Sequence, residues 1–437
     1  MEKKENISKE TFAQTIAGEI KQTTLKNGLR IVTADWPQVE SVIVSLFVNT
    51  GSSRESEAEN GISHLIEHLM FKGAGKRNAQ QITADIAKVG GYINAFTGKD
   101  FTCYHARVLK EHLELVTDVL TDFIMTPTLD PEEMNREKGV VIQEIWRAQD
   151  RPDRMVDDNF LQTAFPNQAV GRSTLGTPEN IRRMDKAMIQ RYLRTHYVAD
   201  NIVAAAVGRI DHDKFVKMVE DRMSALPEHS DFAEITPHYV GGEKIVYKEL
   251  VQTHMELGFA GASTLAPDYY RYMALANILG GGKFSRLYLE VREKLGLVYD
   301  IHCLNGCFRK SGVFTIYAGT TPKEMNTLLP VVVTELKKLI NDKVSAEELE
   351  CTKTKLRAHL LMAQESAFNK MGKIARETLL FNRVIPTEET IAKIEAITAD
   401  DLQTLAQKIF SSTPTYAVFG PESNYPGYAE LQELLKL

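Results

Sequence analysis

The pattern of hydrophobic and polar positions predicts strands and helices in an order that occurs twice along the chain. In the first half, alternation of β-branched and polar residues predicts strands, and apolar residues at helical spacing predict helices. The predicted strands cover residues 23–36, 41–53, 91–108 and 201–210, and the predicted helices cover 64–73, 78–90 and most of 111–196. An Asn-Gly pair at positions 27–28 is a turn signal inside the first strand segment.

The second half repeats this order after a polar segment. Strands are predicted over residues 244–261, 312–321 and 415–421, and helices over 266–281 and most of 322–409. The segment 226–244 contains Pro227 and Pro237, which is typical of a linker. We therefore expect an α+β protein with two homologous domains from an internal duplication, each a mainly antiparallel sheet packed against helices. The expected boundaries are 1–225 for the first domain, 226–244 for the linker and 245–437 for the second domain.

Length, charge and cysteine content narrow the class of protein. A chain of 437 residues is longer than one hydrophobic core normally serves, which agrees with two domains. The formal net charge of -6 argues against nucleic acid or an anionic membrane as a partner, and four scattered cysteines are unlike a secreted disulfide framework. The N-terminus lacks the apolar core of a signal peptide, and no run of about 18 apolar residues predicts a membrane span. We expect a cytoplasmic protein.

The stretch "HLIEHLMFKG" carries the first candidate chemistry. On a helix, His64 and His68 lie on one face and can converge on a metal ion, while Glu67 lies beside them, where its carboxylate could accept a proton from water. Ser63 or Asn60 could cap the start of this helix. The H-x-x-E-H spacing is the reverse of the zincin motif.

The same ten residues also fit a buried amphipathic helix. In that interpretation Leu65, Leu69 and Phe71 belong to the core, and backbone or water satisfies the imidazoles. The spacing alone does not decide between the two interpretations. A catalytic zinc usually takes three protein ligands, so a metal site requires a third ligand elsewhere in the chain.

A second helix offers this third ligand. Asp130 at the cap, Pro131 at the first helical position and Glu133 soon after predict the start of a helix. Glu137 and Glu144 lie two turns apart on it and share a face that apolar residues flank. Because unpaired buried carboxylates are costly, one of them could bind a metal and the other could orient a ligand.

Four motifs in order give almost the whole chain a resemblance to a known family. They are "GISHLIEHLMFKG", "GGYINAFTGKDFTCYHARV", "EKGVVIQEI" and "GGGKFSRLYLEVREKLGLVYDI". These motifs resemble those of the inverzincin zinc metallopeptidases, the family of pitrilysin, insulin-degrading enzyme and mitochondrial processing peptidase. The resemblance implies that His64, His68 and Glu144 bind Zn2+, one ion per chain.

The resemblance also implies roles for four other side chains. Glu67 matches the general base, and Glu137 matches an auxiliary glutamate that supports the metal ligands. Arg292 and Tyr299 match a pair that contacts the substrate and the oxyanion of the reaction. The residues alone favour another interpretation, in which Arg292 lies on a helix surface and Tyr299 packs in the core.

The implied activity is that of a zinc metalloendopeptidase acting on extended or unfolded peptides. Asn94, Ala95 and Phe96 match an edge strand that holds the substrate by β-augmentation. Members of the family close a chamber from four α+β domains, and this chain supplies two and carries both sets of motifs, which implies a clamshell homodimer. The alternative is a non-catalytic or partner-dependent subunit of a heterodimeric processing peptidase.

Overall fold

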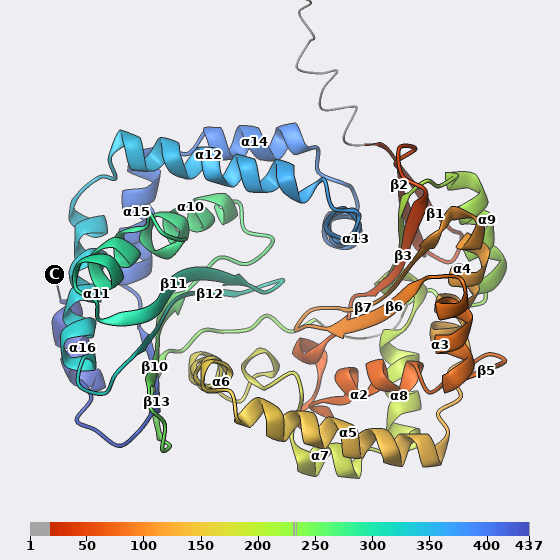
Figure 1. Cartoon of the computed structure of the whole chain (residues 1–437), viewed down its shortest axis with the longest axis horizontal. Coiled ribbons are helices and arrows are strands. Elements are labelled where there is room, and N and C mark those ends of the chain that lie inside the picture. Colours follow the sequence, from red (N-terminus) through yellow and green to blue (C-terminus); the bar gives the residue numbers. More distant parts are fainter. Residues whose placement is uncertain (1–17, 230–231, 233, 437) are drawn as a thin grey trace, which may run out of the picture. The chain divides into compact units, whose positions relative to one another are not determined.

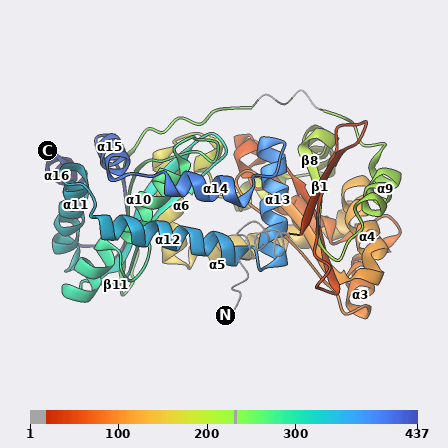
Figure 2. The ribbon, with the colours of Figure 1, turned by 90° about the horizontal axis from the view of Figure 1, so that it is seen from above.

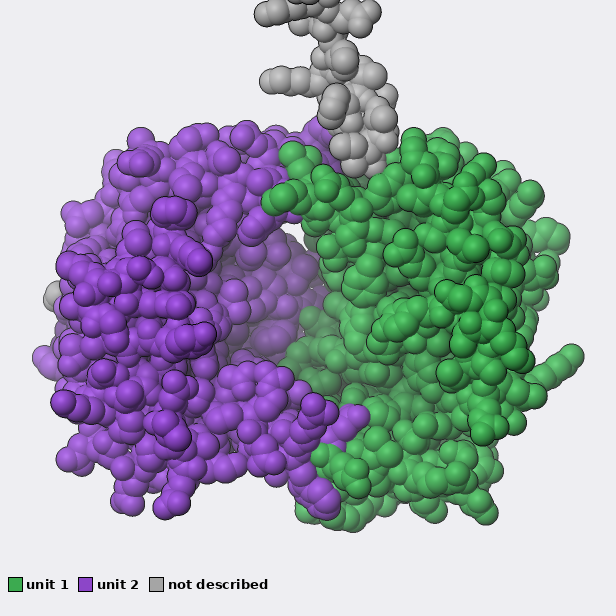
Figure 3. Space-filling model, in the orientation of Figure 1, with its two compact units in different colours: residues 1–143, 174–234, 360–386 green, residues 144–173, 235–359, 387–437 purple. Residues whose placement is uncertain are grey.

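The computed structural model describes residues 18–229, 232 and 234–436, which form two compact units (Figure 3). Unit 1 consists of the chain up to Gln143 together with Thr174–Glu234 and Leu360–Pro386. Unit 2 consists of Glu144–Ser173, Ile235–His359 and Thr387–Leu437. Most of the N-terminus in which we sought a signal peptide lies outside the described residues. None of the described helices has the length and apolar character needed to cross a membrane.

Unit 1 is built on a six-stranded sheet with the order β1-β2-β8-β3-β7-β6. Its strands are β1 (Glu19–Thr24), β2 (Arg30–Asp35), β3 (Ser41–Val48), β6 (Tyr92–Thr97), β7 (Thr102–Leu109) and β8 (Ile202–Gly208). Only β2 and β8 pair in parallel, and the other neighbours are antiparallel. The short strands β4 (Gly73–Ala74) and β5 (Arg77–Asn78) form a separate ribbon. The central strands β3 and β8 are almost entirely buried, which requires helices on both faces of the sheet.

Helices from both halves of the sequence provide this cover. On one face, α2 (Ile62–Met70) and α4 (Leu113–Met125) contact β7, and α4 places Phe123 against Tyr104 of that strand. On the opposite face, α13 (Ala367–Phe381) packs against β2, β3 and β8, as Figure 1 shows. The other α-helices that lie wholly in unit 1 are α3 (Ala79–Lys88), α7 (Pro178–Arg183), α8 (Lys186–His196) and α9 (His212–Met223).

Unit 2 has a five-stranded sheet that repeats the topology of unit 1. The strand order is β11-β12-β10-β13-β9, and only β9 and β13 pair in parallel. Its strands are β9 (Gly242–Tyr247), β10 (Thr253–Ala260), β11 (Val298–Cys307), β12 (Gly312–Thr320) and β13 (Thr415–Gly420). The order matches β6-β7-β3-β8-β2 of unit 1 strand for strand. The predicted α+β class and its duplicated architecture are therefore confirmed.

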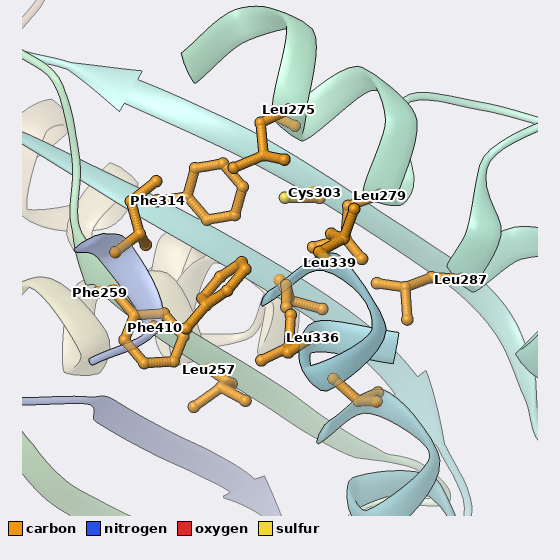
Figure 4. Close-up of a cluster of buried hydrophobic side chains, with 14 of the residues drawn as sticks. Leu257, Phe259, Leu275, Leu279, Leu287, Cys303, Phe314, Leu336, Leu339 and Phe410 are labelled. Carbon is orange, nitrogen blue, oxygen red and sulfur yellow. The ribbon is translucent and has the colours of Figure 1, made fainter. Parts of the chain in front are cut away.

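The core of unit 2 lies between its sheet and three helices. These helices are α10 (Tyr269–Gly280), α11 (Met325–Asn341) and α15 (Ala399–Phe410). Phe259, Phe314 and Phe410 meet in this core among aliphatic side chains (Figure 4). In both views α16 (Tyr428–Leu435) lies beside α11 (Figures 1 and 2). Unit 2 also contains a π-helix (Tyr288–Lys294), α14 (Thr387–Glu395) and most of α12 (Ala346–Ala363).

The compact units differ from the expected continuous domains because each contains a helix from the other half of the sequence. The helix α6 (Pro152–Ala164) places Phe160 against the sheet of unit 2, although we assigned residues 1–225 to the first domain. Conversely, α13 belongs to unit 1. The expected linker also ends too late, since β9 already begins at Gly242, while positions 230, 231 and 233 of the linker lie outside the described residues.

Candidate active site

The helix α2 combines the two interpretations that its sequence allowed. Leu65, Ile66 and Leu69 are buried and fix the helix in unit 1. His64, Glu67 and His68 are only half-buried and lie on the remaining face. The rings of the two histidines lie edge to face, with their centroids 4.8 Å apart. The apolar face therefore anchors the helix, and the polar face carries the two imidazoles and the carboxylate that could bind a metal or accept a proton.

The start of α2 is capped by a residue that the sequence did not indicate. The cap position is Gly61, with φ of +97°, and neither Ser63 nor Asn60 supplies the expected side-chain cap. Instead the buried carboxylate of Glu55 accepts hydrogen bonds from the backbone N–H groups of Gly61 and Ser63, at 2.8 and 2.9 Å. Burial raises the pKa of Glu55, and these hydrogen bonds oppose the rise. The prediction was wrong because this cap comes from a preceding turn.

The helix α5 (Pro131–Gln149) begins where the sequence predicted. The side chain of Asp130 accepts hydrogen bonds from the backbone N–H groups of Glu132 and Glu133, at 2.9 and 3.0 Å. The division between the two units falls inside this continuous helix, directly before Glu144. The cap and the uninterrupted helix fix the relative placement of Glu137 and Glu144.

His64, His68 and Glu144 form a group that could hold a metal ion. One potential ligand atom from each residue lies within 4.8 Å of the other two, and all three residues are half-buried. Two imidazoles and one carboxylate are a donor set that zinc accepts at catalytic sites. The residues present therefore fit the metal that the sequence motif implies.

Glu137 contacts one of these histidines. Its Oε2 lies 3.1 Å from Nδ1 of His68, and its Oε1 lies 2.8 Å from Nζ of Lys72. The Glu137 side chain is buried, so the lysine supplies a positive charge that a buried carboxylate needs. A hydrogen bond from Nδ1 of His68 would leave Nε2 of that ring as the metal-binding atom. Lys72 was not identified from the sequence, although its position one turn after His68 was a usable signal.

Glu67 connects α2 to the edge of the sheet. The hydroxyl of Thr97 donates a hydrogen bond to Oε2 of Glu67 at 2.5 Å. Thr97 is the last residue of β6, which is one of the two edge strands of the six-stranded sheet among the described residues. Asn94, Ala95 and Phe96 therefore lie on an edge strand, as the resemblance implied. Thr97 was not predicted as a site residue.

Arg292 and Tyr299 lie together in unit 2. The guanidinium carbon of Arg292 is 5.3 Å from the ring centroid of Tyr299 and 5.0 Å from that of Tyr288. Tyr299 is 77% exposed, so the alternative in which it packs in the core is wrong. Arg292 belongs to a π-helix, a rare form that often occurs at functional sites.

Comparisons with known proteins give two matches to family models. The model described as Insulinase (Peptidase family M16) matches residues 30–178, which include α2 and α5. The model described as Peptidase M16 inactive domain matches residues 183–356. The candidate metal group and Glu67 all lie in the first match, and Arg292 and Tyr299 lie in the second.

Curated relatives cover nearly the whole chain. An uncharacterized zinc protease of Rickettsia felis is 38% identical over 398 residues, covering 91% of this chain and 96% of the relative. The uncharacterized zinc protease YmxG of Bacillus subtilis is 33% identical over 408 residues, covering 93% of this chain and 100% of that relative. A solved protease from Helicobacter pylori has the same fold, with a TM-score of 0.86 at 23% identity, over 93% of this chain and all of that chain.

Proposed function

Since the chain belongs to the M16 peptidase family, we propose that it is a zinc-dependent endopeptidase that hydrolyses extended or unfolded peptides. The observation that carries this proposal is the group of His64, His68 and Glu144, with Glu67 on the same helix as the two histidines. The family description "inactive domain" applies to a match that begins after these four residues. It therefore does not argue against a site in the first half.

We propose that His64, His68 and Glu144 hold the zinc ion. When bound, zinc would supply Lewis-acid activation of water and of the scissile carbonyl. Glu137 would orient the imidazole of His68, and the ion pair with Lys72 would hold the Glu137 carboxylate in place. The chain's own residues thus provide both the ligands and the groups that fix their orientation.

Glu67 is the proposed general base. A carboxylate in this position can accept a proton from the attacking water and deliver it to the leaving amine. Thr97 orients the carboxylate through its hydroxyl. Because Thr97 ends β6, a peptide paired with this strand would place its backbone beside the base.

The substrate would be bound mainly through its backbone. Pairing with the edge of β6 that has no neighbour among the described strands, at Asn94, Ala95 and Phe96, requires an extended peptide and selects weakly for sequence. Arg292 and Tyr299 are proposed to contact the substrate and to donate hydrogen bonds to the developing oxyanion. The exposed hydroxyphenyl group of Tyr299 is free of the core and suited to this role.

We further propose that the protein works as a homodimer. One chain carries two α+β units, whereas the closed chamber implied by the family resemblance needs four. In such a dimer the metal half of one subunit would face the Arg/Tyr half of its partner, which gives two equivalent sites by two-fold symmetry.

The replacement Glu67→Gln tests the proposed activity. We expect cleavage of a quenched peptide library to fall by about 10²- to 10⁴-fold, the usual contribution of a positioned acid or base, while zinc content and folding are retained. Glu114→Gln, on the surface of α4, is the matched control and should keep wild-type turnover. Unchanged turnover in the Glu67 variant would remove this residue from the mechanism. A zinc-loaded wild-type protein that cleaves no peptide would favour a non-catalytic subunit.

A further inference from the structure

The edge strand β6 presents two faces with different surroundings. Thr97 and the other odd-numbered residues of the strand point toward α2, where Thr97 meets Glu67. Side chains of a strand alternate, so the even-numbered residues point to the opposite face, which α13 covers farther along the sheet. A peptide that extends the sheet at β6 would alternate in the same way, with every second side chain on the α13 face.

An aromatic cluster occupies the α13 face at this edge. The ring of His105, on β7, lies 5.0 Å from Phe368, 6.1 Å from Tyr92 and 6.3 Å from Phe96, measured between centroids. Phe368 is the second residue of α13, and its ring is also 6.5 Å from that of Phe96. Phe368 and Tyr92 remain 43% and 57% exposed, so the cluster leaves aromatic surface open, and it lies at a sheet edge where β6 has no neighbour among the described strands.

His105 is the polar member of this cluster, and it does not give the cluster a charge. Burial lowers the pKa of His105, so its imidazole is neutral near pH 7. Its Nδ1 is buried and has no hydrogen-bond partner among the described residues. A side chain placed beside this cluster would therefore meet aromatic faces and an uncharged ring.

We propose that Phe368, together with Tyr92 and Phe96, forms a subsite for large apolar or aromatic side chains of the bound peptide. A strand added to β6 would lie about 4.8 Å beyond it, and its side chains would be about 5 Å from those of β6 on the same face. That distance brings a peptide side chain into contact with the exposed rings of Tyr92 and Phe368. The subsite acts at alternate peptide positions, on the face away from Glu67.

This assignment rests on the proposed endopeptidase function and adds selectivity to it. Backbone hydrogen bonds along β6 select only weakly among peptide side chains. Phe368 comes from the C-terminal half of the sequence, yet it belongs to unit 1 with the metal-binding helix α2. The helix α13, which comes from the second half of the sequence, thus supplies the proposed selectivity.

The test compares wild type with Phe368→Ala on quenched peptides in which each position is varied among Phe, Leu, Gly and Asp. For wild type we expect kcat/KM to favour Phe and Leu over Asp by about 10- to 100-fold at alternate positions. In Phe368→Ala this ratio should fall at least about tenfold at those positions and stay unchanged at the intervening ones. Phe368→Leu should retain most of the preference.

Phe381→Ala is the matched control, because Phe381 is an exposed phenylalanine at the other end of α13. It should keep the wild-type preference, and thermal unfolding should confirm that all variants fold. An unchanged preference in an active Phe368→Ala enzyme would overturn the subsite but leave the peptidase proposal intact. If wild type cleaves nothing, the peptidase proposal fails, and fluorescence anisotropy of the same peptides on the Glu67→Gln protein then decides the subsite. Binding without a Phe368-dependent preference, or no binding, would overturn it.

Discussion

At the scale of single residues, the carboxylates of this protein differ by what their oxygens contact. Glu67 accepts a hydrogen bond from the hydroxyl of Thr97, whereas Glu137 faces an imidazole and an ammonium group. Glu55 is buried, and its carboxylate accepts hydrogen bonds from two backbone N–H groups. The different partners of Glu67 and Glu137 suit the roles proposed for them, which are proton acceptor for Glu67 and ligand support for Glu137.

Replacing Glu137 should weaken metal binding more than it weakens folding. In Glu137→Gln the His68 ring loses a charged hydrogen-bond partner, and such partners are typically worth about 10- to 100-fold in metal affinity. Competition with a chromophoric chelator measures the zinc dissociation constant. Glu132→Gln, at the exposed start of the same helix, is the control and should bind zinc as wild type does. Equal affinities in both variants would contradict the supporting role of Glu137.

A buried carboxyl group in unit 2 should make stability depend on pH. Burial raises the pKa of Glu256 well above its usual value, and the nearby Asp157 carboxylate raises it further. Because the folded-state pKa is raised, the stabilising protonated form is fully present below the unfolded pKa of about 4.3 and is lost as pH rises through the folded value.

We therefore expect Glu256→Gln, a neutral mimic of the protonated acid, to unfold at a higher temperature than wild type at pH 7.5, by about 2–4 °C for each 1 kcal/mol gained. Near pH 4 the difference should vanish. Scanning calorimetry at both values tests this, with exposed Glu243→Gln of the same sheet as control. A constant difference across pH would show that the ionisation of Glu256 is not its cause.

At the scale of elements, the close approach of the chain at the start of α2 depends on a glycine. Gly61 has φ of +97°, a region that residues with a Cβ atom rarely adopt. A Cβ atom there would also lie 2.7 Å from the carbonyl oxygen of Leu175 and 2.9 Å from Gly176. The loop before α7 thus packs closely against the start of α2, the helix that carries His64 and His68.

Gly61→Ala should therefore destabilise the protein by about 1–3 kcal/mol. Gly139 is a matched comparison, because it lies inside α5 with nothing within 4 Å of an added Cβ. There, Gly139→Ala should stabilise by about 0.5–1 kcal/mol, since alanine favours the helix. Chemical denaturation measures the free energy of unfolding of both variants, which should be lower than wild type for Gly61→Ala and higher for Gly139→Ala. A Gly61 variant as stable as the Gly139 variant would refute the steric argument.

At the scale of the whole molecule, two copies of one sheet topology exchange helices. In unit 1, Phe47 and Ala205 of the sheet are buried in one cluster with Met371 of α13. In unit 2, Phe160 of α6 approaches the backbone of β10 so closely that a Cβ at Gly258 would lie 2.6 Å from its ring. Each unit therefore requires residues from both halves of the sequence.

The proposed dimer predicts complementation between two inactive variants. Glu67→Gln damages the proposed metal half, and Tyr299→Phe damages the proposed Arg/Tyr half. If each site combines halves of two subunits, co-refolded mixtures should recover about a quarter of wild-type activity, because half of the dimers are mixed and each mixed dimer has one intact site of two. Peptide cleavage and solution mass measure this. A mixture no more active than its components, or an active monomer, would contradict the composite site.

Most of the elements and the grouping of candidate residues could be predicted from the amino-acid sequence, because these depend on local periodicity. Helical spacing places His64 and His68 on one face, and the cap at Asp130 fixes the phase of Glu137 and Glu144 along α5. The repeated order of elements likewise predicted two sheets of one topology.

Which distant segments meet depends on the three-dimensional fold and could not be predicted in this way. The cap from Glu55, the contact of Lys72 with Glu137 and the hydroxyl of Thr97 on Glu67 each join residues that no helical or strand periodicity links in advance. The exchange of α6 and α13 was also missed, because an amphipathic helix shows that one face is buried but not which sheet buries it. For that physical reason the proposed subsite at Phe368 depends on the fold and not on any motif.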